Sequence, residues 1–342
     1  MVWGDNVFQV KSWSIQGNTL HQYRYANDHI KISFLNVGAS IHSLYTRDTE
    51  GKFENIVLTY NDILDYHGNV KLLGSSVGPY AGRLSPANIP LRQSIFELQP
   101  NFLEDINLHS GSANLAHVFW DVEEHGDHSI SFVYTLKNSP YYPGELTFKT
   151  HYEIIDNTLV IEYHTVSHED NYASLTNHSY FNLSGDLKRS IENHELYLPS
   201  HQMGQLNEQF ISQSLVKVHE TLFDFNHLSS LDSKLKALKH TPQRGLDHPF
   251  ILTEPTIVLQ DPDSRRRLTL HTNQEAVVVY SNNFIEDVAF YPNIRDKAFL
   301  GICLETQSFP NDIHFKPNPH SFLKAHKPKV QRTKYTFDLI PN

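Results

Sequence analysis

The chain has 342 residues and a formal net charge of −10, with 28 Lys and Arg residues against 38 Asp and Glu residues. A surface of that sign repels phosphate backbones, so we expect no nucleic-acid partner. The apolar fraction of 39% favours a folded core over disorder, and the one cysteine, Cys303, excludes an intrachain disulfide and a four-cysteine zinc site.

The location and the domain organisation follow from what the chain lacks. No apolar run approaches the roughly 18 residues of a membrane-spanning helix. The opening residues Met1–Asn6 lack the basic patch and apolar stretch of a signal peptide. We therefore expect no membrane contact and a cytoplasmic protein. No low-complexity linker divides the sequence, so residues 1–342 are expected to form one domain, either monomeric or homodimeric.

Short strands are predicted along most of the chain, where β-branched and aromatic residues alternate with polar ones between Gly, Pro, Asn and Asp. The first is expected at 29–37 and another at 130–136. The turn signal at residues 156–157 predicts a hairpin between 146–155 and 159–166. Further strands are expected near 255–260, 266–272, 276–281, 299–305 and 334–339.

Helical patterns are few and short. The spacing predicts one turn at 61–66 and two helices, at 207–217 and 229–238. Many strands with little helix between them favour an all-β fold, a large antiparallel β-sandwich, over a parallel α/β sheet. The polar loops of such a sandwich usually build a site on one face.

Three polar segments before residue 190 contain candidate site residues. Arg83 lies between Gly82 and Leu84, and its rigid guanidinium fork suits vicinal hydroxyls or a carboxylate. His109 lies near Gly111 in a tight turn that would admit a ligand. His178 lies in a predicted strand with polar residues on both faces, which is costly in a plain core, and a held imidazole can act as a general acid. The plain alternatives are a solvated arginine, a hydrogen-bonded loop histidine and a satisfied core histidine.

Two more candidates lie nearer the C-terminus. Asp247 precedes His248 and Pro249 and could accept hydrogen bonds from two hydroxyl groups, although an Asx turn before proline is a frequent alternative. Glu305 lies at the end of an apolar strand, where burial would raise its pKa toward that of a general base working near neutral pH. The alternative for Glu305 is a salt bridge at a strand edge.

Two other patterns point to chemistry that the sequence does not support. Gly74–Gly78 matches the Gly-x-Ser-x-Gly elbow of serine hydrolases, but Pro79 and Gly82 follow where that elbow needs a helix. The chain has 22 histidines, yet it contains no His-Glu-x-x-His, Gly-x-Gly-x-x-Gly or phosphate-loop motif. We therefore expect neither a metal nor a cofactor.

In this order and at these intervals, the five segments resemble the aldose 1-epimerase (galactose mutarotase) family. Thr176–Leu183 is similar to the most distinctive signature of that family, and Leu304–Asn311 is similar to its C-terminal signature. The segments around Arg83, His109 and Asp247 occupy the remaining places. The resemblance extends from about residue 10 to the C-terminus and implies a galactose mutarotase-like supersandwich with a few short helices.

The resemblance also implies a cofactor-free isomerase that interconverts the α and β anomers of an aldose of the galactose or glucose type. By this resemblance Glu305 is the general base and His178 the general acid, while Arg83, His109 and Asp247 bind the sugar. Such a pair removes the proton of the C1 hydroxyl and protonates the ring oxygen. The C1–C2 bond then rotates before the ring closes on the other carbonyl face.

Three positions depart from the family pattern. Many members have Arg where Pro79 stands, Gly where Ser110 stands, and Gln near the position of Val278. These differences leave the acid–base pair intact. They leave the preferred sugar open.

Three alternative functions are kept. The first is a non-catalytic carbohydrate-binding or sugar-sensing protein on the same scaffold. The second is a glycoside hydrolase with Glu305 and Asp247 as its carboxylates, which would need to lie roughly 5–9.5 Å apart. The third is an enzyme for hexose 6-phosphates, for which the basic run 265–267 is a weak candidate because it follows a turn on an expected solvated face.

Overall fold

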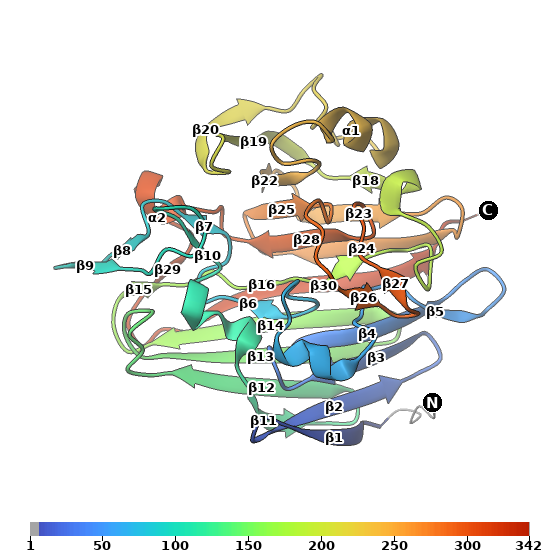
Figure 1. Ribbon diagram of the computed structural model, residues 1–342, viewed down its shortest axis with the longest axis horizontal. Helices are drawn as coiled ribbons and strands as arrows, with labels where there is room; N and C mark the ends of the chain where they lie inside the picture. Colours follow the sequence, from blue (N-terminus) through green and yellow to red (C-terminus); the bar gives the residue numbers. More distant parts are fainter. Residues whose placement is uncertain (1–6, 342) are drawn as a thin grey trace.

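The computed structural model describes residues 7–341. Residues 1–6, which carried the expectation about a signal peptide, lie outside the described residues. Three large antiparallel sheets make up most of the molecule, which confirms the predicted all-β sandwich (Figure 1). Within residues 7–341, no helix is both long and apolar enough to cross a lipid bilayer.

A nine-stranded sheet forms one layer of the sandwich. Its long strands alternate buried and half-exposed residues, the pattern of a sheet with one face on a core. The predicted hairpin is confirmed, and Asp156 takes the positive φ of +51° that its turn requires. The order along the sheet is β11 (Asp121–His125), β12 (Ser129–Leu136), β13 (Leu146–Ile155), β14 (Thr158–Ser167), β30 (Lys329–Leu339), β24 (Arg266–Thr272), β23 (Thr256–Gln260), β18 (Glu195–Tyr197) and β21 (Ser229–Ser230).

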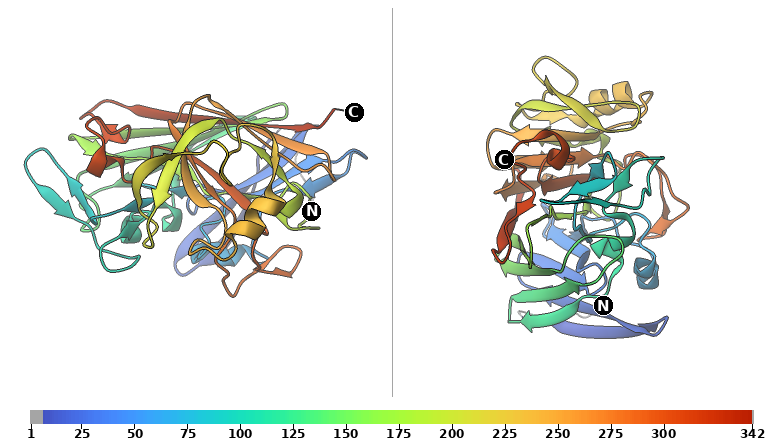
Figure 2. Two further views of the ribbon diagram at one scale, coloured as in Figure 1. Left: turned by 90° about the horizontal axis from the view of Figure 1, so that it is seen from above. Right: turned by 90° about the vertical axis from the view of Figure 1, so that its left-hand side faces the viewer.

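Two smaller sheets pack against this layer, one beside the other, as the views in Figure 2 show. The five-stranded sheet runs in chain order through β1 (Gln9–Ile15), β2 (Asn18–Ala26), β3 (Ile30–Leu35), β4 (Ser40–Arg47) and β5 (Phe53–Asn55). The six-stranded sheet has the order β17 (Tyr180–Phe181), β28 (Ile302–Gln307), β25 (Ala276–Tyr280), β22 (Asp247–Leu252), β19 (Ser200–Leu206) and β20 (Ser212–Lys217).

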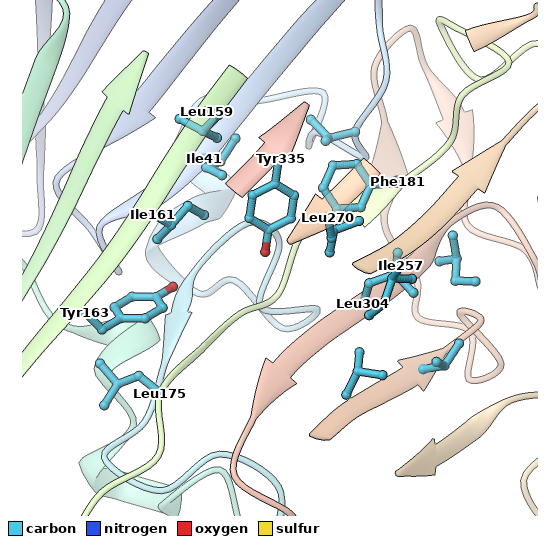
Figure 3. Packing of buried hydrophobic residues seen from close by; sticks show 14 of the residues in the cluster. Ile41, Leu159, Ile161, Tyr163, Leu175, Phe181, Ile257, Leu270, Leu304 and Tyr335 are labelled. Carbon is cyan, nitrogen blue, oxygen red and sulfur yellow. The ribbon is translucent and has the colours of Figure 1, made fainter. Parts of the chain in front are cut away.

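Aromatic contacts join the layers into one core. Phe34 of β3 stacks on Tyr152 of β13 with ring centroids 4.5 Å apart, so the five-stranded sheet covers one half of the nine-stranded sheet. Phe181 of β17 stacks on Tyr335 of β30 at 5.9 Å, so the six-stranded sheet covers the other half (Figure 3). One hydrophobic cluster runs through both halves. Burial on this scale is what stabilises a chain without disulfides.

Short pairs of strands connect the sheets and carry loops toward one side of the six-stranded sheet. They are β6 (Ser76–Val77) with β16 (Thr176–Asn177), β7 (Arg83–Leu84) with β10 (Asn107–Leu108), β8 (Asn88–Pro90) with β9 (Ile95–Glu97), β15 (Asn171–Tyr172) with β29 (Phe322–Leu323), and β26 (Ala289–Phe290) with β27 (Ile294–Arg295).

Of the predicted helices, two are confirmed and one is wrong. A 3-10 turn occupies 63–67, and α1 (Leu231–Leu238) begins at an N-cap, Ser230, that accepts the amide hydrogen of Asp232. A second short helix is α2 (Asp312–Phe315). The helix predicted at 207–217 is instead a turn followed by strand β20, because Asn207 accepts the amide hydrogens of Gln209 and Ile211 and the rest pairs with β19. Sheet pairing overrides the helical spacing there.

Candidate active site

A cavity of about 400 Å³ opens on the face of the six-stranded sheet that is turned away from the nine-stranded sheet. All five candidate residues line it: Arg83, His109, His178, Asp247 and Glu305. They come from β7, the turn after β10, the segment between β16 and β17, β22 and β28. The tertiary structure thus brings together side chains that lie up to 222 residues apart in sequence (305 − 83).

The register of β22, β25 and β28 sets the floor of the cavity. Asp247 pairs with Tyr280, and Tyr280 pairs with Cys303. Two residues further along, Val278 pairs with Glu305. Successive residues of a strand point to opposite faces, so the intervening positions face the core and these two rows face the cavity. The floor therefore has one polar row, containing Asp247 and Tyr280, and a second row in which Glu305 lies beside the apolar Val278.

Glu305 and His178 form a buried pair. The Nε2 atom of His178 lies 3.4 Å from Oε1 of Glu305, and the residues are 5% and 3% exposed. The other ring nitrogen of His178, Nδ1, lies 3.6 Å from Sγ of Cys303. The pair is close enough for a proton to pass between the two groups and a bound molecule.

The backbone of His178 is held in place by the segment that resembled a hydrolase elbow. Its amide donates to the carbonyl of Ser75 at 2.9 Å, and its carbonyl accepts from Gly74 at 3.0 Å. Gly74 has φ +64°, and a Cβ atom there would lie 1.9 Å from the carbonyl oxygen of Ile41. The glycine is thus required for close backbone approach, and the predicted strand around His178 is interrupted, as β16 ends at Asn177 and β17 begins at Tyr180.

Burial moves the two pKa values of the pair in opposite directions. It raises the pKa of Glu305 to about 8, helped by the charge of Asp247 and opposed by Arg83. It lowers the pKa of His178 to about 4, against its own backbone and Asp247, while Lys71 lowers it further. Between about pH 4 and pH 8, Glu305 and His178 together hold one titratable proton when no ligand is bound. Burial favours the state in which that proton leaves both groups uncharged.

Arg83 and Asp247 form an ion pair at the side of the pocket. An Nη2–Oδ2 distance of 3.0 Å joins β7 to β22. The guanidinium also packs against the rings of Phe102 and Phe210, with its central carbon 4.9 and 5.1 Å from their centroids. These contacts hold the charge of Arg83 in one place and leave further donors and acceptors of the pair for a ligand.

His109 is fixed by two hydrogen bonds with one backbone residue. Its amide donates to the carbonyl of Gly82 at 2.9 Å, and its Nδ1 accepts the amide hydrogen of Gly82 at 3.1 Å. Burial, His178 and Arg83 lower its pKa well below the usual range, so the ring is neutral. A neutral imidazole that accepts at Nδ1 carries its proton on Nε2. His109 is therefore a hydrogen-bond donor.

The same bond argues against a metal ion at this position. His109, His178 and Glu305 offer ligand atoms within 4.8 Å of one another, a spacing compatible with a metal. Catalytic zinc sites use three protein ligands, each with a free lone pair. The only ring lone pair of neutral His109 is engaged by Gly82, and moving the proton to Nδ1 would set two N–H groups against each other. The three residues do not fit a metal ion.

The three positions that depart from the family pattern have different surroundings. The Ser110 hydroxyl accepts the amide hydrogen of Tyr80 at 2.8 Å and donates to its carbonyl at 3.2 Å, so it braces the loop before Arg83. Pro79 is not among the residues that line the cavity, and its carbonyl accepts from Ser174. Val278 does line the cavity, beside Glu305.

Several lining residues were not anticipated from the sequence. Phe102, Phe210 and Phe284 form an aromatic wall, with successive ring centroids 5.8 and 6.0 Å apart. Lys71 and Tyr280 add two polar side chains to the lining. None of these side chains lies in a polar motif, and strand alternation around Tyr280 was the only available signal.

The chain is similar to known proteins over most of its length. The family model for aldose 1-epimerase matches residues 21–336. The chain is 26% identical over 335 residues to galactose mutarotase from Mus musculus, which covers 94% of this chain and 95% of that protein. It is 26% identical over 310 residues to aldose 1-epimerase from Streptococcus thermophilus, covering 85% and 86%.

Solved structures show the same fold. The galactose 1-epimerase from Lactobacillus acidophilus matches with a TM-score of 0.84 at 23% identity, covering 97% of this chain and 98% of that one. An aldose epimerase homologue from C. elegans matches with a TM-score of 0.86 at 22% identity, covering 98% and 100%. These likenesses confirm the expected mutarotase-like sandwich.

Proposed function

The chain belongs to the aldose 1-epimerase family, and from that membership we propose that it interconverts the α and β anomers of a free aldose in the cavity described above. The observation that carries the proposal is the buried pair of Glu305 and His178, 3.4 Å apart, on a cavity lined by hydrogen-bonding groups. The family's enzymes are named for galactose and for aldoses in general. A neutral sugar of that type is the proposed substrate.

In the proposed reaction Glu305 is the general base and His178 the general acid. Glu305 takes the proton from the C1 hydroxyl while His178 protonates the ring oxygen, which breaks the C1–O5 bond and leaves an aldehyde. Rotation about C1–C2 presents the other carbonyl face. The ring then closes with both proton transfers reversed, so each group ends as it began.

The proton inventory of the pair supports this scheme. Between pH 4 and 8 the two groups hold one proton, which is the number that one acid and one base require. In the empty pocket burial favours that proton on Glu305. A sugar hydroxyl donating to the carboxylate stabilises its charged form, as Arg83 already does, and Asp247 stabilises charge on His178.

Arg83, His109 and Asp247 are proposed to bind the sugar. Arg83 and the Nε2–H of His109 supply donors, and the carboxylate of Asp247 supplies acceptors. Each is pinned by a second partner, so little side-chain entropy is lost when a ligand arrives. A sugar hydroxyl both donates and accepts hydrogen bonds, so it can pair with the donors of Arg83 and His109 and with the acceptors of Asp247.

The charges at the cavity favour a neutral sugar over a sugar phosphate. Arg83 is paired with Asp247, and Lys71 lies 2.8 Å from Asp296. The lining carries two cations against three acidic residues, which gives no surplus positive charge for a phosphate. The basic run 265–267 is not in the lining, and its buried member Arg266 is paired with Glu54.

We also propose that the chain works as one domain. A single hydrophobic cluster contains residues of all three large sheets, and the catalytic pair spans elements that no short segment could hold alone. The cavity lies on the six-stranded sheet, whose other face is part of that shared core.

Optical rotation tests the function. Purified protein is added to freshly dissolved α-D-glucose and α-D-galactose, alongside Glu305→Gln, His178→Asn and, as a matched control, the exposed Glu50→Gln. We expect wild type and the control to speed relaxation to the same end point and the two site variants to lose most of that rate. Sugar binding without any acceleration would show a binding protein instead, and release of reducing sugar from glycosides would show a hydrolase.

A further inference from the structure

Tyr280 has a polar group in the cavity for which the proposed acid–base scheme has no use. It ends β25, between Asp247 on one neighbouring strand and Cys303 on the other, and it lines the cavity. Its hydroxyl oxygen accepts the amide hydrogen of Phe284 at 3.2 Å. Within residues 7–341, this hydroxyl donates no hydrogen bond. A mostly buried phenol normally donates as well as accepts.

Several other buried tyrosines donate through their hydroxyls, whereas among the described residues Tyr60 only accepts, from the amide of Lys71, and the Tyr163 hydroxyl has no hydrogen-bond partner. Tyr180 also lines the cavity, but its hydroxyl donates to the carbonyl of Lys71 at 3.0 Å. The hydroxyl of Tyr80 donates to Asp312 at 2.6 Å, and that of Tyr152 donates to the carbonyl of Ala39 at 2.6 Å. Tyr180 and Tyr280 both line the cavity, and of these two Tyr280 is the one whose hydroxyl makes no donated hydrogen bond within the described residues.

The protonation state of Tyr280 suits a donor. Burial raises its pKa, and the nearby charge of Asp247 raises it further, against the amides of Phe284 and Asn283. The phenol therefore keeps its proton throughout the range in which Glu305 and His178 hold one proton between them.

The neighbours of Tyr280 on the sheet indicate what it would bind. Directly opposite residues of neighbouring strands have Cβ atoms about 4.5–5.5 Å apart, so Asp247 and Tyr280 lie side by side. Arg83 holds Oδ2 of Asp247, and a carboxylate has about four acceptor sites, which leaves acceptor capacity. The Tyr280 donor and the Asp247 acceptor together can bind one sugar hydroxyl, or two hydroxyls on adjacent carbons. The next residue on this face, Val278, offers neither.

We propose that Tyr280 is a specificity-determining residue that donates a hydrogen bond to a sugar hydroxyl bound next to Asp247, and that it supplies on β25 the polar contact that Val278 lacks. This inference rests on the proposed function for its substrate class. Tyr280 transfers no proton in the reaction, so its contribution is to binding and to the choice of sugar.

The consequence is a dependence on one hydroxyl of the sugar. A site that is built to bond a hydroxyl discriminates against the analogue that lacks it, because its own buried polar groups are left unpaired. Removing the phenol oxygen removes that penalty. Wild type and Tyr280→Phe should then differ most for the parent sugar and least for the one deoxy sugar that lacks the bound hydroxyl.

The test compares Tyr280→Phe with wild type on the parent aldose and on its monodeoxy derivatives, by optical rotation. We expect kcat/KM for the parent to fall about 3- to 10-fold, mostly through KM. For one deoxy sugar the variant and wild type should be equal within about twofold. An equal loss on every sugar, or no loss on any, would overturn the inference.

The matched control is Tyr180→Phe, which removes a hydroxyl in the same cavity that already has an acceptor. Any change it causes should be the same for all sugars. A thermal melt of each variant shows that it folds, and Kd values for the same sugars by calorimetry repeat the comparison without turnover. If wild type turns over sugar but Tyr280→Phe shows no dependence on a particular hydroxyl, the inference about Tyr280 is wrong and the proposed function stands. Binding with that effect but without turnover would end the proposed function alone.

Discussion

Two glutamates that are almost fully shielded from solvent occupy opposite electrostatic environments. Glu54, on β5, is 0% exposed and accepts hydrogen bonds from Lys52 at 2.9 Å, Lys188 at 2.6 Å and Arg266 at 3.0 Å. Burial alone would raise its pKa, but these three cations lower it to about 2. Glu305 is 3% exposed, and burial raises its pKa to about 8.

The difference shows what each carboxylate is built for. Glu54 is fully paired and joins the five-stranded sheet to β24 of the nine-stranded sheet through Arg266. Glu305 has a neutral histidine as its neighbour, while the cation that lowers its pKa, Arg83, is engaged with Asp247. A buried carboxylate whose charge is fully compensated contributes to structure. One whose charge is left uncompensated can exchange a proton near neutral pH.

The largest expected effect is on turnover. Glu305→Gln should lower kcat/KM by about 10²–10⁴-fold, because it removes one partner of the proton transfer. Glu54→Gln, measured below its melting temperature, should stay within a few-fold of wild type. Initial rates of anomer relaxation measure both. Equal losses of activity in the two variants would contradict the assignment of proton transfer to Glu305 and of a structural role to Glu54.

The second effect is on stability, where the substitution of Glu54, and not that of Glu305, is expected to be destabilising. Glu54→Gln should lower the free energy of unfolding by about 3–5 kcal/mol, since it leaves the buried charge of Arg266 without its partner. Urea unfolding followed by tryptophan fluorescence measures the loss. A midpoint unchanged from wild type would mean that water or a rearranged neighbour compensates Arg266.

The third effect is a stability gain from the active-site variant. The folded-state pKa of Glu305, about 8, lies above its ordinary value of 4.5, so its contribution to stability is complete below pH 4.5 and is lost as pH rises through 8. Glu305→Gln should therefore exceed wild type by an amount that grows over this range, on the order of a few kcal/mol at pH 8. Thermal melts at pH 5 and pH 8 check the trend, and a constant difference would contradict it.

The smallest effect is the slope of the pH profile. Below about pH 4 both members of the pair are protonated and no base is left, and above about pH 8 both are deprotonated and no acid is left. Outside this window kcat/KM should fall about tenfold per pH unit on each side. A profile that stays flat from pH 7 to 10 would show that Glu305 does not titrate as its burial indicates.

Local patterns in the sequence were sufficient for most of the strands, and polar motifs together with the family resemblance pointed to five residues that all line the cavity. Alternation along β13 and β14 identifies a hairpin because one face of each strand meets the core. The prediction of a helix at 207–217 was wrong because this segment forms an edge strand that pairs with β19. That pairing cannot be read from the residues of the segment itself. Tyr280 was missed for a similar reason, since its place beside Asp247 in the cavity lining depends on strand pairing.

The sequence by itself determined the all-β class, the absence of disulfides and the residue types available for acid–base chemistry, because these depend on composition and on short-range periodicity. Only the tertiary structure decided the charge state of each residue. Glu54 and Glu305 are the same residue type, and both lie in strands. Burial, helped by Asp247, raises the pKa of Glu305 to about 8, whereas the cations that the sheets bring to Glu54, Lys188, Lys52 and Arg266, lower its pKa to about 2.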